Sequence, residues 1–185
     1  IGDRRQRQMC IRDRLRTEHG LKAITLIRDQ VKGANVGVGT VCNATEFDAA
    51  VDAGANFVVS PGQSNALFER ALVTNIPFLP GAVTATEVMA AKEAGFKVLK
   101  FFPASTSGGA AAIKAFAGPF ADLQFVPTGG INLDNAGSYL SLSNVRAVGG
   151  SWLTPADAIQ NGQWEHITHV AVSYTHLRAH ETTPH

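Results

Sequence analysis

The stretch "KVLKFFPASTS", residues 97–107, places a lysine inside an apolar run. Lys100 alternates with Val98 and Phe102 at the period of two that defines one face of a β-strand. Burial disfavours the charged ammonium and lowers a lysine pKa, by up to about 3–5 units when burial is complete. A lysine that is neutral near pH 7 is a nucleophile toward carbonyl carbon and can form a Schiff base. The alternative is a lysine whose head group reaches solvent or pairs with a carboxylate.

Two glycine pairs suggest a second kind of chemistry. Gly129-Gly130 and Gly149-Gly150 each end a short apolar run, and Ser151 follows the second pair. Paired glycines let backbone N–H groups approach an anion closely, and (β/α) barrels often bind phosphate in the loops after their last two strands. A single pair would be explained by a simple chain turn. Two pairs on consecutive units, with a serine hydroxyl beside the second, favour a phosphate site.

A repeating pattern of elements would position these residues. Short apolar runs alternate with Ala-rich amphipathic stretches, and they predict strands near 36–41, 57–60, 78–79, 98–102, 124–127 and 147–149. Helices are predicted over 44–53, 65–72, 84–94, 108–116, 133–140 and 155–161, and "TATE" at 84–87 is a capping box. The alternation predicts parallel βα units. The segment "GVGTVCN" lacks the third glycine of a dinucleotide-binding loop, which counts against a dinucleotide-binding site there.

Composition bounds the class of protein. A chain of 185 residues that is 45% hydrophobic and 17% charged predicts one globular domain. No apolar stretch approaches the ~20 residues of a membrane helix, so we expect no membrane association. Two cysteines cannot form a disulfide framework, so we expect a cytoplasmic protein in which Cys42 is a small buried strand residue. Residues 15–172 hold ten basic and twelve acidic side chains, so we expect no nucleic-acid partner.

Six motifs together resemble one enzyme family. They are "VGVGTV", "VVSPG", "PFLPGAVTATEVM", "KVLKFFPA", "GPFADLQFVPTGGI" and "GGSWL". In this order they closely resemble the 2-keto-3-deoxy-6-phosphogluconate aldolases, which also cleave 4-hydroxy-2-oxoglutarate. The resemblance runs from about Leu15 to Val172. It implies a class I aldolase, a carbon–carbon lyase of the Entner–Doudoroff pathway, with an α/β fold of the (β/α)8 TIM-barrel type. It also implies a homotrimer that needs no metal and no organic cofactor.

The resemblance implies a role for each matching position. Lys100 matches the Schiff-base lysine that attacks the C2 ketone of the phosphorylated 2-keto-3-deoxy sugar acid, so that retro-aldol cleavage gives glyceraldehyde 3-phosphate and then pyruvate. Arg16 and Thr40 match residues that hold the pyruvyl carboxylate, to which a guanidinium donates two parallel hydrogen bonds. Pro61 and Phe102 would line the pocket. The other substrate-binding positions are Thr128 and, for the phosphate, Gly129, Gly130, Gly150 and Ser151.

One position departs from the family pattern. The family's general base is a glutamate three residues before the Leu of "LRT", and this chain has Arg12 there. Loss of a general base commonly costs ~10²–10⁴ in rate. We therefore expect Lys100 to trap pyruvate while turnover is impaired.

The two ends of the chain are unlike its middle. "RQRQMCIRDR" and "VSYTHLRAHET" resemble translated sequencing-adapter sequence, which implies a foreign leader at 1–14, an aldolase barrel fragment at 15–172 and a foreign tail at 173–185. The barrel would then be incomplete, with family strands three to eight present and the first two largely missing. The strand at 36–41 would be an exposed edge unless the leader or another chain covers it, so we expect poor solubility or domain swapping.

Three alternatives stay open at this point. A 2-keto-3-deoxy-6-phosphogalactonate aldolase would differ in the stereochemistry accepted at one carbon. A non-catalytic barrel that binds sugar phosphates would be favoured if Lys100 were exposed to water. A phosphosugar isomerase would need a carboxylate or histidine at the strand ends, and the strand-end segments "VGTV", "SPG", "PGA", "KFFPA", "PTGG" and "VGGSW" contain neither.

Overall fold

The computed structural model describes residues 10–14 and 19–175. Within these residues no helix has the length and apolar character needed to cross a membrane. The chain divides after Lys100 into two compact units, one formed by residues 1–100 and the other by residues 101–185.

The first unit is built on a parallel sheet whose strands lie in chain order. These strands are β1 (Cys10–Arg14), β2 (Asn35–Gly39), β3 (Phe57–Val59) and β4 (Phe78–Leu79). Consecutive neighbours without a reversal of order are the arrangement of a (β/α) barrel, whereas the order of a doubly wound sheet reverses at a switch point. Lys100, in β5 (Val98–Phe101), continues this pairing, because its N–H donates to Pro80 O at 2.8 Å and its carbonyl accepts from Ala82 N–H at 2.9 Å.

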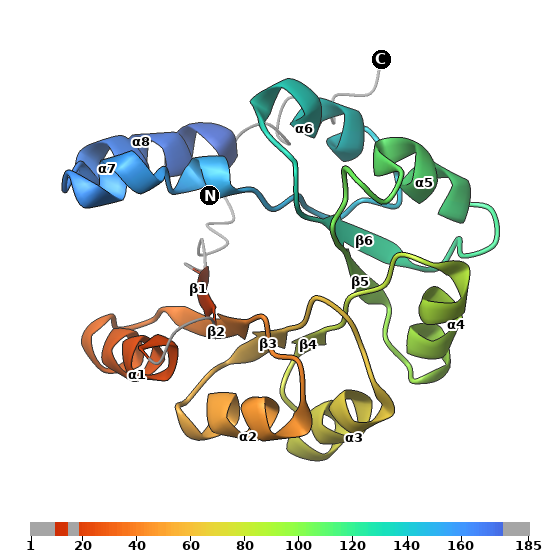
Figure 1. The fold of residues 1–185 in the computed structure, drawn as a ribbon, viewed down its shortest axis with the longest axis horizontal. Helices are drawn as coiled ribbons and strands as arrows, with labels where there is room; N and C mark the ends of the chain where they lie inside the picture. Colours follow the sequence, from red (N-terminus) through yellow and green to blue (C-terminus); the bar gives the residue numbers. More distant parts are fainter. Residues whose placement is uncertain (1–9, 15–18, 176–185) are drawn as a thin grey trace, which may run out of the picture. The chain divides into compact units, whose positions relative to one another are not determined.

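Four helices follow the strands of the first unit. They are α1 (Gly20–Gln30), α2 (Ala44–Asp52), α3 (Asn65–Thr74) and α4 (Ala85–Glu93). Helices α1, α2 and α3 lie on the same side of the sheet (Figure 1). They cover a core that includes Ile24, Val38 and Phe47, each fully buried. The apolar faces of the helices therefore hold the sheet in place and leave the C-terminal strand ends to the loops.

The second unit contains β6 (Gln124–Pro127), which pairs with β5 in a two-stranded sheet. Its helices are α5 (Gly109–Phe116), α6 (Leu133–Leu140), the 3₁₀ turn η1 (Ser151–Leu153), α7 (Ala156–Gln160) and α8 (Trp164–Thr175). Helices α7 and α8 lie side by side in Figure 1. Phe101, Phe116 and Phe125 form an aromatic core, with the rings of Phe116 and Phe125 stacked at 5.6 Å.

The structure confirms most of the predicted elements. The strands at 57–59, 78–79, 98–101 and 124–127 and the helices that follow them agree with the predictions within two residues. The strand predicted at 147–149 is wrong as a continuous element. The segment makes one isolated parallel bridge, Gly149 with Thr128, and a second bridge joins Val145, just before the segment, to Phe125. Helices α1 and α8 were not predicted.

Strand β1 was also not predicted, although it falls within the segment interpreted as a foreign leader. It pairs in parallel with β2 over five residues, from Cys10 opposite Asn35 to Arg14 opposite Gly39. The strand at 36–41 was expected to be an exposed edge unless the leader or another chain covers it. Residues 10–14 of the leader pair with β2, so they cover this edge. The proposed domain boundaries at 14/15 and 172/173 stay predictions.

Candidate active site

Lys100 lies one residue before the end of β5 and is 6% exposed. Its strand neighbours Leu99 and Phe101 are fully buried. The bridge to Gly81 sets the lysine at the C-terminal end of β4, where parallel strands present their loops. The alternative in which the lysine head group extends into solvent is therefore wrong. A buried amine at the C-terminal end of parallel strands is compatible with Schiff-base chemistry, since desolvation is one way to make a lysine nucleophilic.

Thr40 directly follows β2 and has a left-handed backbone, with φ of +66°. A positive φ is unusual for a β-branched residue, and such strain is concentrated at functional sites. After Thr40 the chain returns to the sheet, since Val41 N–H donates to Val59 O at 3.3 Å. The surrounding sheet thus holds Thr40 in a conformation that its side chain alone disfavours.

Cys42 is exposed, and the prediction that it is a buried strand residue is wrong. Strand β2 ends at Gly39, so Cys42 lies in the following loop, where its N–H donates to Glu46 Oε2 at 2.6 Å. Desolvation raises the pKa of the Cys42 thiol, and the Glu46 carboxylate raises this pKa further. The Lys100 charge acts on this pKa in the opposite direction.

The loops after β3 and β4 are tied together beside Pro61. Gly62 N–H donates to Ser60 Oγ at 3.2 Å, and Gly81 N–H donates to Gly62 O at 2.9 Å. A Cβ atom on Gly81 would overlap the Pro61 carbonyl, so only glycine allows this close approach. Pro61 is consequently fixed by the backbone of the neighbouring loop.

Gln63 is a residue of these loops that the sequence did not single out. Its Nε2 donates to Glu87 O at 2.6 Å. Its Oε1 is buried and accepts no hydrogen bond from any described residue. A glutamine after "SPG" carries no recognisable motif, so no signal in a single sequence could have identified it.

Within the second unit, the first glycine pair lies beside Phe101 and Phe102. Thr128 N–H donates to Phe101 O at 2.9 Å, which fixes the residue before the pair. Gly129 and Gly130 have φ of +94° and +72°, which side chains of L-residues rarely adopt. A Cβ on Gly129 would lie 3.1 Å from the Phe102 ring. The Thr128 hydroxyl is buried and has no hydrogen-bond partner within the described segments.

The second glycine pair lies beside the first. Gly149 N–H donates to Pro127 O at 3.0 Å, and Gly149 bridges to Thr128. Gly150 precedes η1, whose first residue Ser151 is exposed. The structure therefore places the two predicted glycine pairs beside each other in the second unit, and Ser151 directly follows the second pair.

The remaining predicted positions are distributed between the units or undescribed. Lys100, Thr40 and Pro61 belong to the first unit, and Phe102 and the glycine pairs belong to the second. Arg16 lies outside the described residues. Arg12 is in β1, and its backbone lies opposite Gly37 of β2. Over residues 10–14 and 19–175 no group of three or more His, Cys, Asp or Glu side chains could hold a metal ion.

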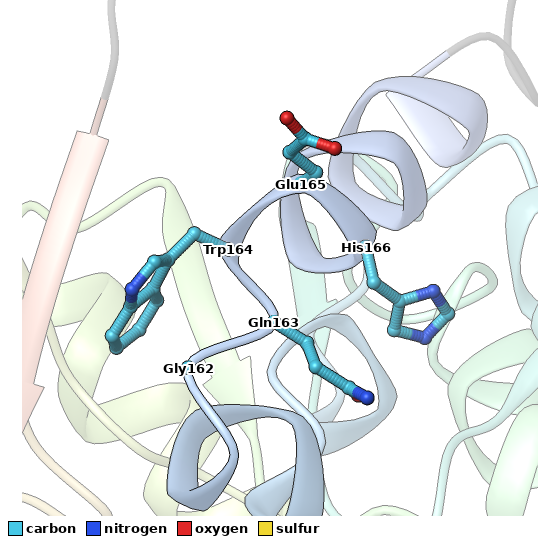
Figure 2. Close-up of a pocket in the computed structure, with 5 residues that line it drawn as sticks. All are labelled: Gly162, Gln163, Trp164, Glu165 and His166. Atoms are coloured by element: carbon cyan, nitrogen blue, oxygen red, sulfur yellow. The ribbon is translucent and has the colours of Figure 1, made fainter.

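An open hollow of about 620 Å³ lies at the start of α8 and contains none of the predicted residues. It is lined by consecutive residues from Gly162 to His166. In Figure 2 the side chains of Trp164 and His166 point in opposite directions, and the Glu165 carboxylate points away from both. Because these groups do not converge, the hollow has no arrangement for catalysis. Trp164, one of the lining residues, is 63% exposed.

Comparison with known proteins identifies relatives of the same kind. The sequence model of the family described as "KDPG and KHG aldolase" matches residues 10–170. The 2-dehydro-3-deoxy-phosphogluconate aldolase of Pseudomonas aeruginosa is 45% identical over 153 residues, which cover 83% of this chain and 70% of the relative.

Two solved structures extend the likeness to the fold. A KDPG aldolase from Legionella pneumophila, captured with pyruvate as a covalent carbinolamine intermediate, superposes with a TM-score of 0.86 at 39% identity and covers 89% of this chain and 80% of that chain. The 2-keto-3-deoxy-6-phosphogluconate aldolase of Zymomonas mobilis with 3-phosphoglycerate has a TM-score of 0.76 at 41% identity, covering 80% and 70%. With its sequentially ordered parallel strands and its buried strand-end lysine, this chain belongs to the KDPG and KHG aldolase family, class I lyases of the TIM-barrel fold.

Proposed function

We propose that this chain cleaves 2-keto-3-deoxy-6-phosphogluconate to pyruvate and glyceraldehyde 3-phosphate, and 4-hydroxy-2-oxoglutarate to pyruvate and glyoxylate. The observation that carries the proposal is the burial of Lys100 at the C-terminal end of β5. Burial favours the neutral amine over the ammonium, and the neutral amine is the nucleophile. The burial also counts against a non-catalytic sugar-phosphate-binding barrel.

The proposed reaction begins with attack of the Lys100 Nζ lone pair on the C2 ketone, which gives a carbinolamine. Loss of water from the carbinolamine leaves an iminium ion. As the C4 hydroxyl loses its proton to a base, the C3–C4 bond breaks and its electron pair forms an enamine on the pyruvyl half. Protonation at C3 and hydrolysis of the iminium by water then release pyruvate and the free lysine. The buried site keeps this sequence of proton transfers away from bulk solvent.

We assign binding of the pyruvyl carboxylate to Thr40 and Arg16. The strained backbone of Thr40 supports this role, since it marks a position held by its surroundings. Pro61 and Phe102 are assigned to the lining of the pocket. For the substrate phosphate we propose Gly129, Gly130, Gly150 and Ser151, with Thr128 beside them. Gly129 and Gly130 have positive φ, and glycines present backbone N–H groups without a Cβ in the way, which suits an anion.

The proton transfers of this reaction need a general base. Arg12 occupies the position at which the family resemblance places the general base, and a guanidinium cannot accept a proton near neutral pH. We propose that turnover of this chain is slow for that reason, although Lys100 still forms the Schiff base. We also propose that the chain is cytoplasmic and assembles as a homotrimer.

Release of pyruvate from each substrate, coupled to its reduction by lactate dehydrogenase, tests the function. We expect slow release from the phosphogluconate substrate and none from Lys100→Met. Arg12→Glu restores a carboxylate and should raise kcat by roughly 10²–10⁴-fold. Equal rates for Lys100→Met and the unchanged chain would refute the lysine assignment. Faster release from the phosphogalactonate epimer would instead favour that aldolase.

A further inference from the structure

Ser105 lies beside the first glycine pair, and none of the roles described above includes it. Its position is set by the backbone, because Ala104 N–H donates to Thr128 O at 2.8 Å and Ser105 N–H donates to Gly129 O at 3.1 Å. These two bonds fix the segment after β5 against the loop after β6. The location of Ser105 therefore does not depend on its own side chain.

The hydroxyl of Ser105 is directed over Gly130. A Cβ built on Gly130 would overlap Ser105 Oγ and would lie 2.6 Å from Ser105 Cβ. Both residues are exposed, and the Ser105 hydroxyl makes no hydrogen bond with any described residue. The adjacent Thr106 differs in this respect, because its hydroxyl donates to Pro103 O at 3.4 Å. Of these two neighbouring hydroxyls, that of Ser105 is the one available to a ligand above Gly130.

We propose that Ser105 is a further phosphate-binding residue, which donates its hydroxyl hydrogen to the phosphate held by the glycine pairs. The inference rests on the proposed function, which places the phosphate at Gly129, Gly130, Gly150 and Ser151. A hydrogen bond to a charged acceptor is stronger than one between neutral groups, so one added hydroxyl changes affinity measurably. Because the bond goes to the phosphate, Ser105 favours phosphorylated over unphosphorylated 2-keto acids.

The test compares Ser105→Ala with Thr106→Val, which removes the neighbouring hydroxyl. Calorimetric titration with glycerol 3-phosphate measures the affinity of the phosphate site without requiring turnover. We expect Ser105→Ala to weaken this binding about three- to tenfold. Ser105→Asp should weaken it further, because a carboxylate repels the phosphate. Thr106→Val should bind as the unchanged chain does.

Kinetics provide a second measurement that a merely structural role would not affect. The ratio of KM for the phosphogluconate substrate to KM for 4-hydroxy-2-oxoglutarate, which has no phosphate, should rise about three- to tenfold in Ser105→Ala. An unchanged ratio, or unchanged affinity for glycerol 3-phosphate, would overturn the assignment of Ser105.

Failure of the proposed function would be visible separately. Pyruvate would then not be trapped on Lys100 of the unchanged chain, a step that does not involve Ser105. Failure of the unchanged chain to bind glycerol 3-phosphate would overturn the inference directly, since no phosphate would be held at the glycine pairs.

Discussion

At the scale of single residues, Thr40 combines a strained backbone with a proposed role in binding. Its φ of +66° is costly for a β-branched residue, and strain of this kind amounts to about 1–3 kcal/mol. The Cys42 thiol donates to the Thr40 carbonyl at 3.4 Å, which helps to hold the turn. A residue kept in such a conformation is expected where function, rather than stability, determines the side chain.

Thr40→Gly should therefore stabilise the fold while it weakens substrate binding. We expect the free energy of unfolding to rise by about 1 kcal/mol, because glycine adopts this conformation without strain. Thr40→Val is the matched control, since valine keeps the branching and the strain but lacks the hydroxyl. Both variants should raise KM for pyruvate-forming substrates, and only the glycine variant should be more stable in urea. A glycine variant of lower stability would show that Thr40 is not strained.

The residue scale also shows what one sequence can predict. The burial of Lys100 was predictable, since apolar neighbours at a period of two identify a covered strand. The environment of Cys42 was not, because its location depends on where β2 ends, and that end is set by the turn at Thr40. No propensity predicts a positive φ at threonine. The turn at Thr40, and with it the exposure of Cys42, therefore depends on tertiary packing.

At the scale of elements, α4 has a complete capping box. The Thr84 hydroxyl accepts from Glu87 N–H at 3.3 Å, and Glu87 Oε2 accepts from the N–H groups of Val83 and Thr84 at 2.8 Å each. Desolvation raises the pKa of Glu87, but these backbone bonds and the bond to the Thr84 side chain together lower it. The carboxylate form is thus stabilised in the folded state.

Thr84→Ala should cost about 1 kcal/mol of unfolding free energy at neutral pH, and Thr84→Ser should cost much less because it keeps the capping hydroxyl.

The pH dependence of the Glu87 contribution to stability follows from its lowered pKa. The contribution of Glu87 is fully present above about pH 4.3, its unfolded value, and is lost as the pH falls through the lower folded value. In thermal melts the unchanged chain should be more stable than Glu87→Gln at neutral pH, and this difference in stability should shrink over that acidic range. An advantage that grows in acid would contradict the capping box.

The elements also separate what was predictable from what was not. The capping box of α4 and the helix at 133–140 could be located from sequence, because caps and turn residues act locally. The segment at 147–149 has strand-like residues, yet its bridge joins only Gly149 to Thr128, and such pairing depends on a partner that is distant in the sequence. Strand β1 has a charged sequence with little alternation, so only its pairing with β2 reveals it.

At the scale of the whole molecule, β1 decides whether the parallel sheet of the first unit has an open edge at β2. Its five residues pair with β2, a strand whose residues 36–39 are all buried. An uncovered, apolar strand edge is a template for association between chains. The residues interpreted as a foreign leader therefore include a segment that protects the sheet.

Removal of residues 1–14 should cause aggregation or domain swapping, whereas removal of residues 176–185 should not. The first deletion takes away β1 and exposes the backbone groups of β2. Size-exclusion chromatography with light scattering would compare both with the full chain. If the chain without residues 1–14 eluted at the same mass as the full chain and unfolded as cooperatively, β1 would be shown to have no protective role.

The central claim is that Lys100 forms a Schiff base with pyruvate. Sodium borohydride reduces such an iminium to a stable amine, so the chain incubated with pyruvate and borohydride should gain one covalent adduct, mapped by peptide mass spectrometry to Lys100. The adduct should be absent from Lys100→Met, while Lys97→Met, a change at an exposed lysine three residues earlier, should keep it. Labelling at another lysine, or no labelling of the unchanged chain, would contradict the account.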